Sequence, residues 1–276
     1  MRFVLERKNS LRLQIVVCLI LPILLTGCGS GNSNTGSTSS GGISGNWQIS
    51  LQPSIPKSKP IAQSGFLLEN NGVLTGGMAV QNNACPGTGN VLGSVSGSNI
   101  TFSVTPAGLD LEFTGSMTKA GTMGGNYTVL STGCTGNFTA PQTGTWTANQ
   151  VSPLNINIQG LFTSSHQNLN PGTFNITGKV TQGPSTGEST TSLAGTLSAT
   201  GYCFFTTANV SGTISGTSVV LNVVGSDGTQ IGQINGTTSL DGSSFNGSYR
   251  MIGLGPGHEP PCVNGDTGTV TWPSPS

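Results

Sequence analysis

The chain has 276 residues, of which only 7% are charged, and its nine Lys or Arg are balanced by nine Asp or Glu. This scarcity of basic residues excludes the clustered positive charge of a nucleic-acid-binding protein. A disordered chain combines low hydrophobicity with high net charge, and this chain has neither, so we expect a folded protein. Ser, Thr, Asn and Gln supply most of its polarity, and with β-branched residues and 43 glycines they favour strands joined by tight turns.

The first 27 residues have the pattern of a secretory signal peptide. Arg2, Arg7, Lys8 and Arg12 precede an apolar run over residues 15–25 that only Pro22 interrupts. Eleven residues are too few to span a bilayer, which takes about 20 helical residues. We therefore expect export and removal of residues 1–27.

The residues at the end of this run are Leu25-Thr26-Gly27-Cys28. They resemble the lipobox of bacterial lipoproteins, and the resemblance implies cleavage before Cys28 and acylation of its thiol. Cys28 is then a lipid anchor to the membrane, which places the chain in the bacterial cell envelope. Gly29 stands where an aspartate retains some lipoproteins at the inner membrane, so the resemblance favours the outer membrane and leaves the face open. The alternative is an ordinary signal peptide with a chance cysteine.

A Gly/Ser-rich tract follows the cysteine, and residues 28–45 are predicted to form a lipidated tether. A flexible coil of this length reaches roughly 20 to 25 Å on average.

Beyond the tether, apolar residues alternate with polar ones at the two-residue period of a strand. Ile100, Phe102 and Val104 share one face of such a run, and no helical spacing extends over twelve residues. Eight strand-like runs are expected in the first half of the body, and eight more follow in the same order. The first eight begin near Asn46, Ile61, Val73, Val91, Asn99, Leu109, Thr122 and Gly144.

The body is a duplication. The stretch NVLGSVSGSNITFSV at residues 90–104 matches NVSGTISGTSVVLNV at residues 209–223, and Tyr127 aligns with Tyr249. So long a repeat is a duplicated domain, because solenoid repeats usually run about 20 to 50 residues. We expect one β domain over residues 46–151 and a second over residues 154–276. Short connections favour antiparallel meanders that close into eight-stranded barrels, with a two-sheet sandwich as the rival.

The first unit opens with GNWQ around Trp47 and closes with GTWTA around Trp146. This pattern resembles the calycin-type barrels, the avidins and lipocalins, in which an early Gly-x-Trp closes one end of the barrel.

Four cysteines remain in the body, two in each repeat. Export permits disulfides, and of three possible connectivities only Cys85–Cys134 with Cys203–Cys262 respects the duplication. The two cysteines of each repeat are too far apart in sequence for a metal site, so neither a metal nor a cofactor is expected.

Two groups of residues are candidates for binding. Trp47, Trp146 and Trp272 are suited to stack on a sugar or another flat ligand, or else to fill the core. Tyr249 and Cys262 are 13 positions apart where their first-copy equivalents are 7 apart, so the second copy carries a longer loop. Near it lie Arg250, His258 and Glu259, which either bind a partner or are simply solvated.

These observations predict a non-catalytic, lipid-anchored envelope lipoprotein that binds a partner protein, a glycan or a small ligand. The alternative is a structural spacer at the cell surface without a specific ligand. A hydrolase is a more distant alternative, because neither histidine of the body has a catalytic constellation visible in the sequence.

Overall fold

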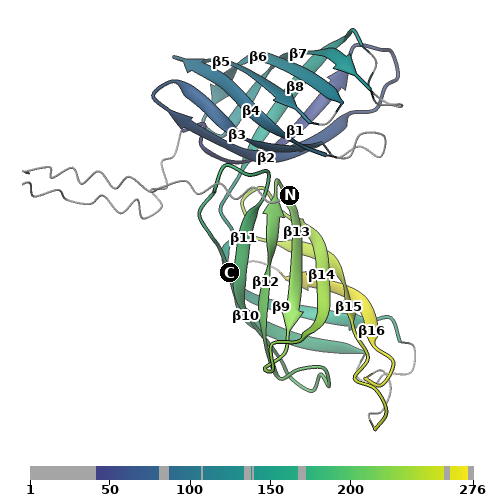
Figure 1. Cartoon of the computed structure of the whole chain (residues 1–276). Coiled ribbons are helices and arrows are strands. Elements are labelled where there is room, and N and C mark those ends of the chain that lie inside the picture. Colours follow the sequence, from purple (N-terminus) through teal and green to yellow (C-terminus); the bar gives the residue numbers. More distant parts are fainter. Residues whose placement is uncertain are drawn as a thin grey trace, which may run out of the picture. The chain divides into compact units, whose positions relative to one another are not determined.

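The computed structural model describes residues 42–80, 87–106, 108–133, 138, 140–166, 172–257 and 262–272. They form two closed antiparallel β-barrels that follow one another along the chain (Figure 1). Outside the described residues lie the signal peptide, the lipobox with Cys28, most of the tether, Cys85 with Cys134, and His258 with Glu259. Within the described ranges, no helix has the length and apolarity needed to cross a membrane.

The first barrel is an eight-stranded meander in which each strand pairs with the next and the last returns to the first. Eight residue pairs join β1 to β8, from Asn46–Val151 to Pro53–Gly144. Its strands are β1 (Gly45–Pro53), β2 (Ile61–Asn70), β3 (Val73–Val80), β4 (Gly87–Ser96), β5 (Asn99–Thr105), β6 (Leu109–Lys119), β7 (Thr122–Thr132) and β8 (Gln142–Val151).

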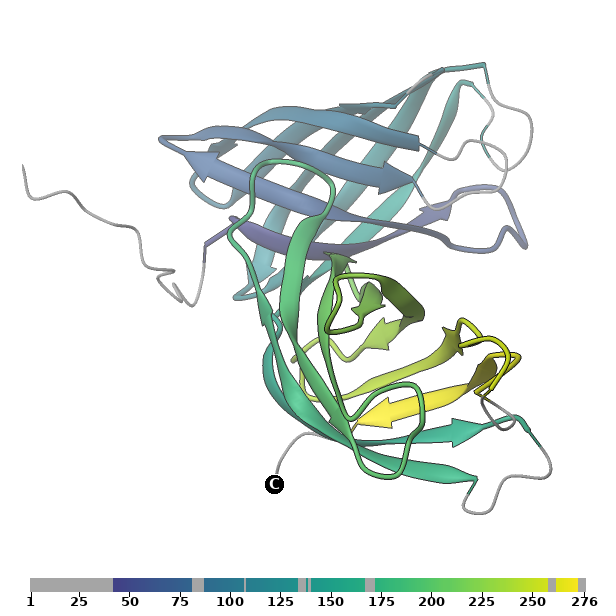
Figure 2. The same ribbon diagram turned by 60° about the horizontal axis from the view of Figure 1, so that its bottom comes forward.

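The second barrel repeats this topology, and β9 pairs with both β10 and β16 to close the ring (Figures 1 and 2). The β9–β16 seam is short, with four residue pairs from Gly268–Ser164 to Thr271–Leu161. Its strands are β9 (Asn155–Ser164), β10 (Thr173–Gln182), β11 (Thr191–Ala199), β12 (Thr207–Ser215), β13 (Ser218–Val224), β14 (Gln230–Thr238), β15 (Phe245–Met251) and β16 (Asp266–Trp272).

The expected all-β class, the tandem duplication and the preference for barrels over sandwiches are confirmed. The expected strand beginnings in the first barrel agree closely with those observed, except at β4 and β8. Strand β4 begins at Gly87, four residues before the expected position, because Gly87 and Gly89 carry no side chains that could show alternation. Strand β8 begins at Gln142, two residues early, because this inward residue is polar.

The duplication is also seen in the pairing register. Val91 of β4 pairs with Val104 of β5, and their counterparts in the second copy, Val210 and Val223, pair in the same way. Matching sequence positions therefore occupy matching positions in the two barrels, and residues can be compared one to one between them.

The three tryptophans belong to the barrel interiors, with exposed fractions of 0% for Trp47, 1% for Trp146 and 1% for Trp272. The Nε1 of Trp47 donates to the Ile43 carbonyl at 2.7 Å, and that of Trp146 donates to a backbone carbonyl in β6 at 3.1 Å. The Trp272 ring stacks on Phe245 at a centroid distance of 3.9 Å. All three rings therefore pack in the barrel cores, although among the described residues the buried Trp272 Nε1 has no hydrogen-bond partner. The ligand contact expected from the sequence stays a prediction.

Candidate functional site

Four connections of the second barrel, including its longest, emerge at one end. In an up-and-down barrel alternate connections emerge at the same end, which here brings together the described residues 165–166 and 172, 200–206, 225–229, 252–257 and 262–265. We call this end of the second barrel the loop end. Loops held on a rigid β scaffold are common binding sites, so the loop end is the first place to look for function.

A buried carboxylate lies at the loop end. Asp266 is the first residue of β16, and its side chain points inward with 0% exposure. Oδ1 accepts a hydrogen bond from the Ser164 hydroxyl at 2.6 Å and lies 3.3 Å from Nδ1 of His166. Oδ2 accepts from the hydroxyls of Tyr202 at 2.9 Å and Tyr249 at 2.7 Å. We call these five residues the Asp266 cluster.

The donors surrounding Asp266 make its burial tolerable. An isolated buried carboxylate is very costly, whereas hydrogen bonds to both oxygens replace the contacts with water that burial removes. The donors come from four places in the chain: Ser164 ends β9, His166 follows that strand, Tyr202 lies in the β11–β12 connection, and Tyr249 lies in β15. The cluster therefore ties together segments that are far apart in sequence.

Local sequence explains how each phenol reaches the carboxylate. Tyr249 lies over Gly268, its direct partner on β16, where a Cβ would stand 2.9 Å from the tyrosine Cε1. Tyr202 belongs to the β11–β12 connection, which the Cys203–Cys262 disulfide joins to the β15–β16 connection at a Cα–Cα distance of 6.1 Å. The predicted pairing of these two cysteines is confirmed.

Aromatic rings fill the barrel beneath the cluster. Tyr202 packs against Phe174 at a centroid distance of 4.6 Å and against Phe204 at 5.2 Å. Phe162 stacks on Tyr249 at 4.4 Å and meets Phe205 edge-on at 6.3 Å. The β11–β12 connection thus inserts its rings into the loop end and closes the interior there.

The environment of the cluster raises the pKa of both phenols. Burial is the main cause for Tyr202, and the neighbouring Tyr249 and Asp266 raise its pKa further. Burial is again the main cause for Tyr249, followed by its hydrogen bond to Asp266. Both phenols therefore stay neutral at neutral pH and act as hydrogen-bond donors rather than as bases.

A hollow of about 1010 Å³ lies against this cluster. Its lining includes the side chains of Gln233, Asn235, Arg250 and Thr267, and the imidazole of His166. Of the binding residues expected from the sequence, the structure places Arg250 in this hollow. His258 and Glu259 lie outside the described residues.

Sequence reasoning missed the Asp266 cluster, although one signal was present. The run DTGTVTW at residues 266–272 alternates like a strand whose inward face includes position 266, and a buried aspartate needs partners. The identity of those partners could not be read, because Ser164 is 102 positions away along the chain. Across the residues that the structure describes, no three His, Cys, Asp or Glu side chains gather as metal ligands.

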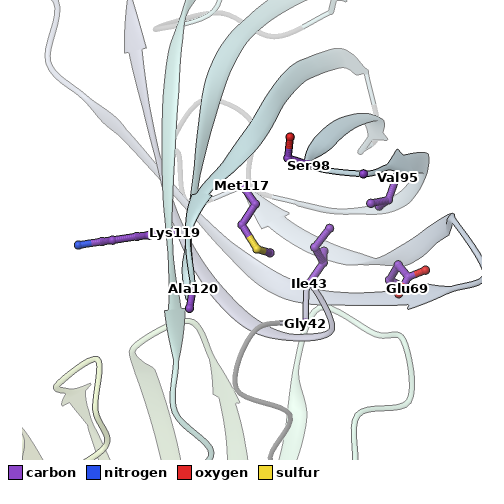
Figure 3. A pocket seen from close by; sticks show the side chains of 9 residues that line it. Gly42, Ile43, Glu69, Val95, Ser98, Met117, Lys119 and Ala120 are labelled. Carbon is purple, nitrogen blue, oxygen red and sulfur yellow. The ribbon is translucent and has the colours of Figure 1, made fainter.

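The first barrel has a smaller hollow, of about 490 Å³, at the end where the chain enters it. Figure 3 shows Met117 and Ile43 directed toward the same space, while the Lys119 side chain extends away from it. Glu69 is already engaged, because its Oε1 accepts a hydrogen bond from the Gly72 amide at 2.8 Å. The charged groups of this hollow therefore do not converge on a common ligand position.

Comparison with known proteins found no matching family model, no matching curated protein and no matching solved structure. Arguments about function therefore come from the site itself.

The phenols provide a prediction about pH. All three tyrosines of the chain, Tyr127, Tyr202 and Tyr249, have pKa values raised by burial. A raised pKa in the folded state stabilises the fold fully below the unfolded value, near pH 10, and this stability is lost as the pH rises through the folded values. We expect tyrosinate absorbance to stay low between about pH 10 and 11 and then to rise together with loss of the β-sheet circular dichroism signal. Normal titration of two or three phenols in the folded protein would contradict the buried cluster.

A second prediction concerns the carboxylate. Asp266→Ala leaves the two buried tyrosine hydroxyls and the half-buried Ser164 hydroxyl without their acceptor, so we expect the free energy of unfolding to fall by at least about 3 kcal/mol. The matched control is Asp227→Ala, at an exposed turn of the same barrel, which should have a much smaller effect. Urea denaturation of the oxidised protein measures both. Equal midpoints for the two variants would show that the Asp266 cluster does not hold the barrel together.

Proposed function

We propose that this chain is a lipid-anchored protein of the bacterial cell envelope that binds a partner without catalysing its conversion. The lipobox at Cys28 and the Gly/Ser-rich tether support the anchor. Two or three acyl chains bury enough methylene groups, at about 0.8 kcal/mol each, to hold a protein stably at a membrane. The tether then leaves the barrels room to reach a ligand near that surface.

The observation that carries the binding role is the hollow at the loop end of the second barrel. Its outer residues lie on strands of a closed barrel, and its inner wall rests on the buried Asp266 cluster. A disulfide and an aromatic core fix the connections around it. Such a site is organised before binding, which lowers the entropic cost of association.

The hydrogen-bond pattern of the Asp266 cluster supports a binding function over hydrolysis. Ser164, His166 and Asp266 are the residue types of a hydrolytic triad, and the His166 Nδ1 faces the carboxylate as a triad requires. In a triad the serine hydroxyl donates to the histidine Nε2, whereas here the Ser164 hydroxyl donates directly to Asp266. The hydroxyl is thus bonded to the buried carboxylate instead of to an imidazole nitrogen, so the arrangement favours a structural role for all three residues.

One observation favours the second candidate, a structural spacer. The three tryptophans, which would be the natural stacking residues for a ligand, lie inside the barrels. A spacer needs only such filled interiors and a polar exterior. The two candidates differ in whether the hollow has a ligand, and the binding experiment below separates them.

The anchor is tested by metabolic labelling with a palmitate analogue in a bacterial host. Wild-type protein should be labelled and processed, and Cys28→Ser should be neither, because the acylated thiol is missing. Cys18→Ser, in the apolar run of the signal peptide, is the matched control and should keep the label. Equal labelling of the Cys28→Ser protein would refute the anchor.

The binding role is tested with the mature chain carrying Cys28→Ser, screened on a glycan array and against envelope extracts. Thr267→Trp places a bulky ring in the hollow, while Thr271→Trp makes the same change at an exposed position further along β16. We expect Thr267→Trp to reduce binding at least about tenfold, which corresponds to about 1.4 kcal/mol, and Thr271→Trp to leave it unchanged. Absence of any ligand, or equal binding by both variants, would favour the spacer.

A further inference from the structure

We propose that the hollow recognises an acidic glycan, with the Arg250 guanidinium pairing with a sugar carboxylate. This inference rests on the proposed binding function and names its ligand class. It depends on three features of the described residues: a row of polar side chains across adjacent strands, an amide network that fixes part of the row, and an unpaired cation at its centre.

The row follows from the strand register. Gln233 of β14 is the direct partner of Arg250 on β15, and Arg250 is the direct partner of Thr267 on β16. Directly opposed residues on one face of an antiparallel pair have Cβ atoms about 4.5 to 5.5 Å apart. An amide, a guanidinium and a hydroxyl therefore stand side by side along the hollow.

Hydrogen bonds between amides fix one side of the row. The Gln233 Nε2 donates to Asn222 Oδ1 at 3.1 Å, and the Gln233 Oε1 accepts from Asn235 Nδ2 at 3.1 Å. Gln230 Nε2 also donates to Asn222 Oδ1, at 3.3 Å. An amide offers two donors and two acceptor lone pairs, so each of these side chains keeps capacity for sugar hydroxyls while its position is held.

Arg250 is exposed, and none of the described carboxylates pairs with it. Three of the described carboxylates in the second barrel accept hydrogen bonds from other residues. Asp266 is enclosed by its donors, Asp227 accepts from Thr229, and Asp241 accepts from Ser239 and Ser243. In a chain with so few charges, a guanidinium that no described carboxylate pairs with attracts an anion strongly.

The surroundings of Arg250 favour a carboxylate on a carbohydrate. A guanidinium binds a carboxylate through two parallel hydrogen bonds, and a single cation matches a single negative charge. Ile252, two residues after Arg250, lines the same hollow, and 55% of its surface is exposed. Its side chain offers an apolar contact for the C–H face of a sugar ring. An acidic peptide would supply carboxylates but few hydroxyls for the amide network.

The test measures binding of the oxidised mature chain, carrying Cys28→Ser, to three probes by isothermal titration calorimetry. The probes are a uronic acid oligosaccharide, a neutral glucose oligosaccharide of equal length, and a short polyglutamate. We expect binding of the uronate alone. Arg250→Gln should weaken it at least about tenfold, as expected for loss of a charge-assisted bidentate pair, and Arg250→Lys should weaken it less.

Lys179→Gln is the matched control, because it removes one exposed positive charge from β10 of the same barrel. It should change the affinity less than about twofold, and equal denaturation midpoints establish that both variants are folded. Equal losses in Arg250→Gln and Lys179→Gln would mean nonspecific charge attraction and would overturn the proposal.

The remaining outcomes separate the ligand class from the proposed function. Preferred binding of polyglutamate, or binding of the neutral oligosaccharide that Thr267→Trp abolishes and Arg250→Gln does not, would overturn the acidic glycan and keep a binding hollow. If none of the probes binds, the acidic glycan is wrong. If the glycan array and envelope extracts also give no ligand, the binding function fails as well.

Discussion

The closing seam of each barrel is the constraint on which the rest of the structure depends, because without it two strand edges would be left unpaired. In the first barrel eight residue pairs form this seam, whereas in the second β9 and β16 contribute four. Just beyond the short seam, the Ser165 amide donates to the Thr267 carbonyl at 2.7 Å and the Ser164 hydroxyl donates to Asp266. The backbone pairing between β9 and β16 is short, and the side chains of the Asp266 cluster extend this closure. The hollow lies against the same part of the barrel.

The two copies show how duplication can create a site. Gln142 of the first barrel occupies the position of Asp266, since each is paired with the residue two places after the aligned tyrosine. The tyrosine itself lies over a glycine in both copies, and a Cβ at Gly144 would stand 2.5 Å from the Tyr127 Cε1. Both copies therefore share the Tyr–Gly contact, and the second copy also has the Asp266 carboxylate and Tyr202. In the second barrel the shared tyrosine thus becomes part of the Asp266 cluster.

The sequence was sufficient for the fold because alternation, the duplication and the cysteine count all report on the backbone. Strand order, barrel closure and the Cys203–Cys262 disulfide followed from them. It was insufficient for the site, because the Asp266 cluster is assembled from positions up to 102 residues apart and no local pattern encodes that meeting. Arg250 stood out only through the rarity of charge, and Trp272 suggested a ligand although its ring stacks within the core.

The central claim is that recognition takes place at the outer hollow of the second barrel and leaves the barrel interiors undisturbed. Its most direct test is a nitrogen–proton NMR titration of the labelled mature chain with the uronic acid oligosaccharide. We expect the largest shifts on the amides of Gln233, Arg250 and Thr267, and no shift of the three tryptophan indole signals. Shifts of the indole signals, or shifts concentrated in the first barrel, would contradict it.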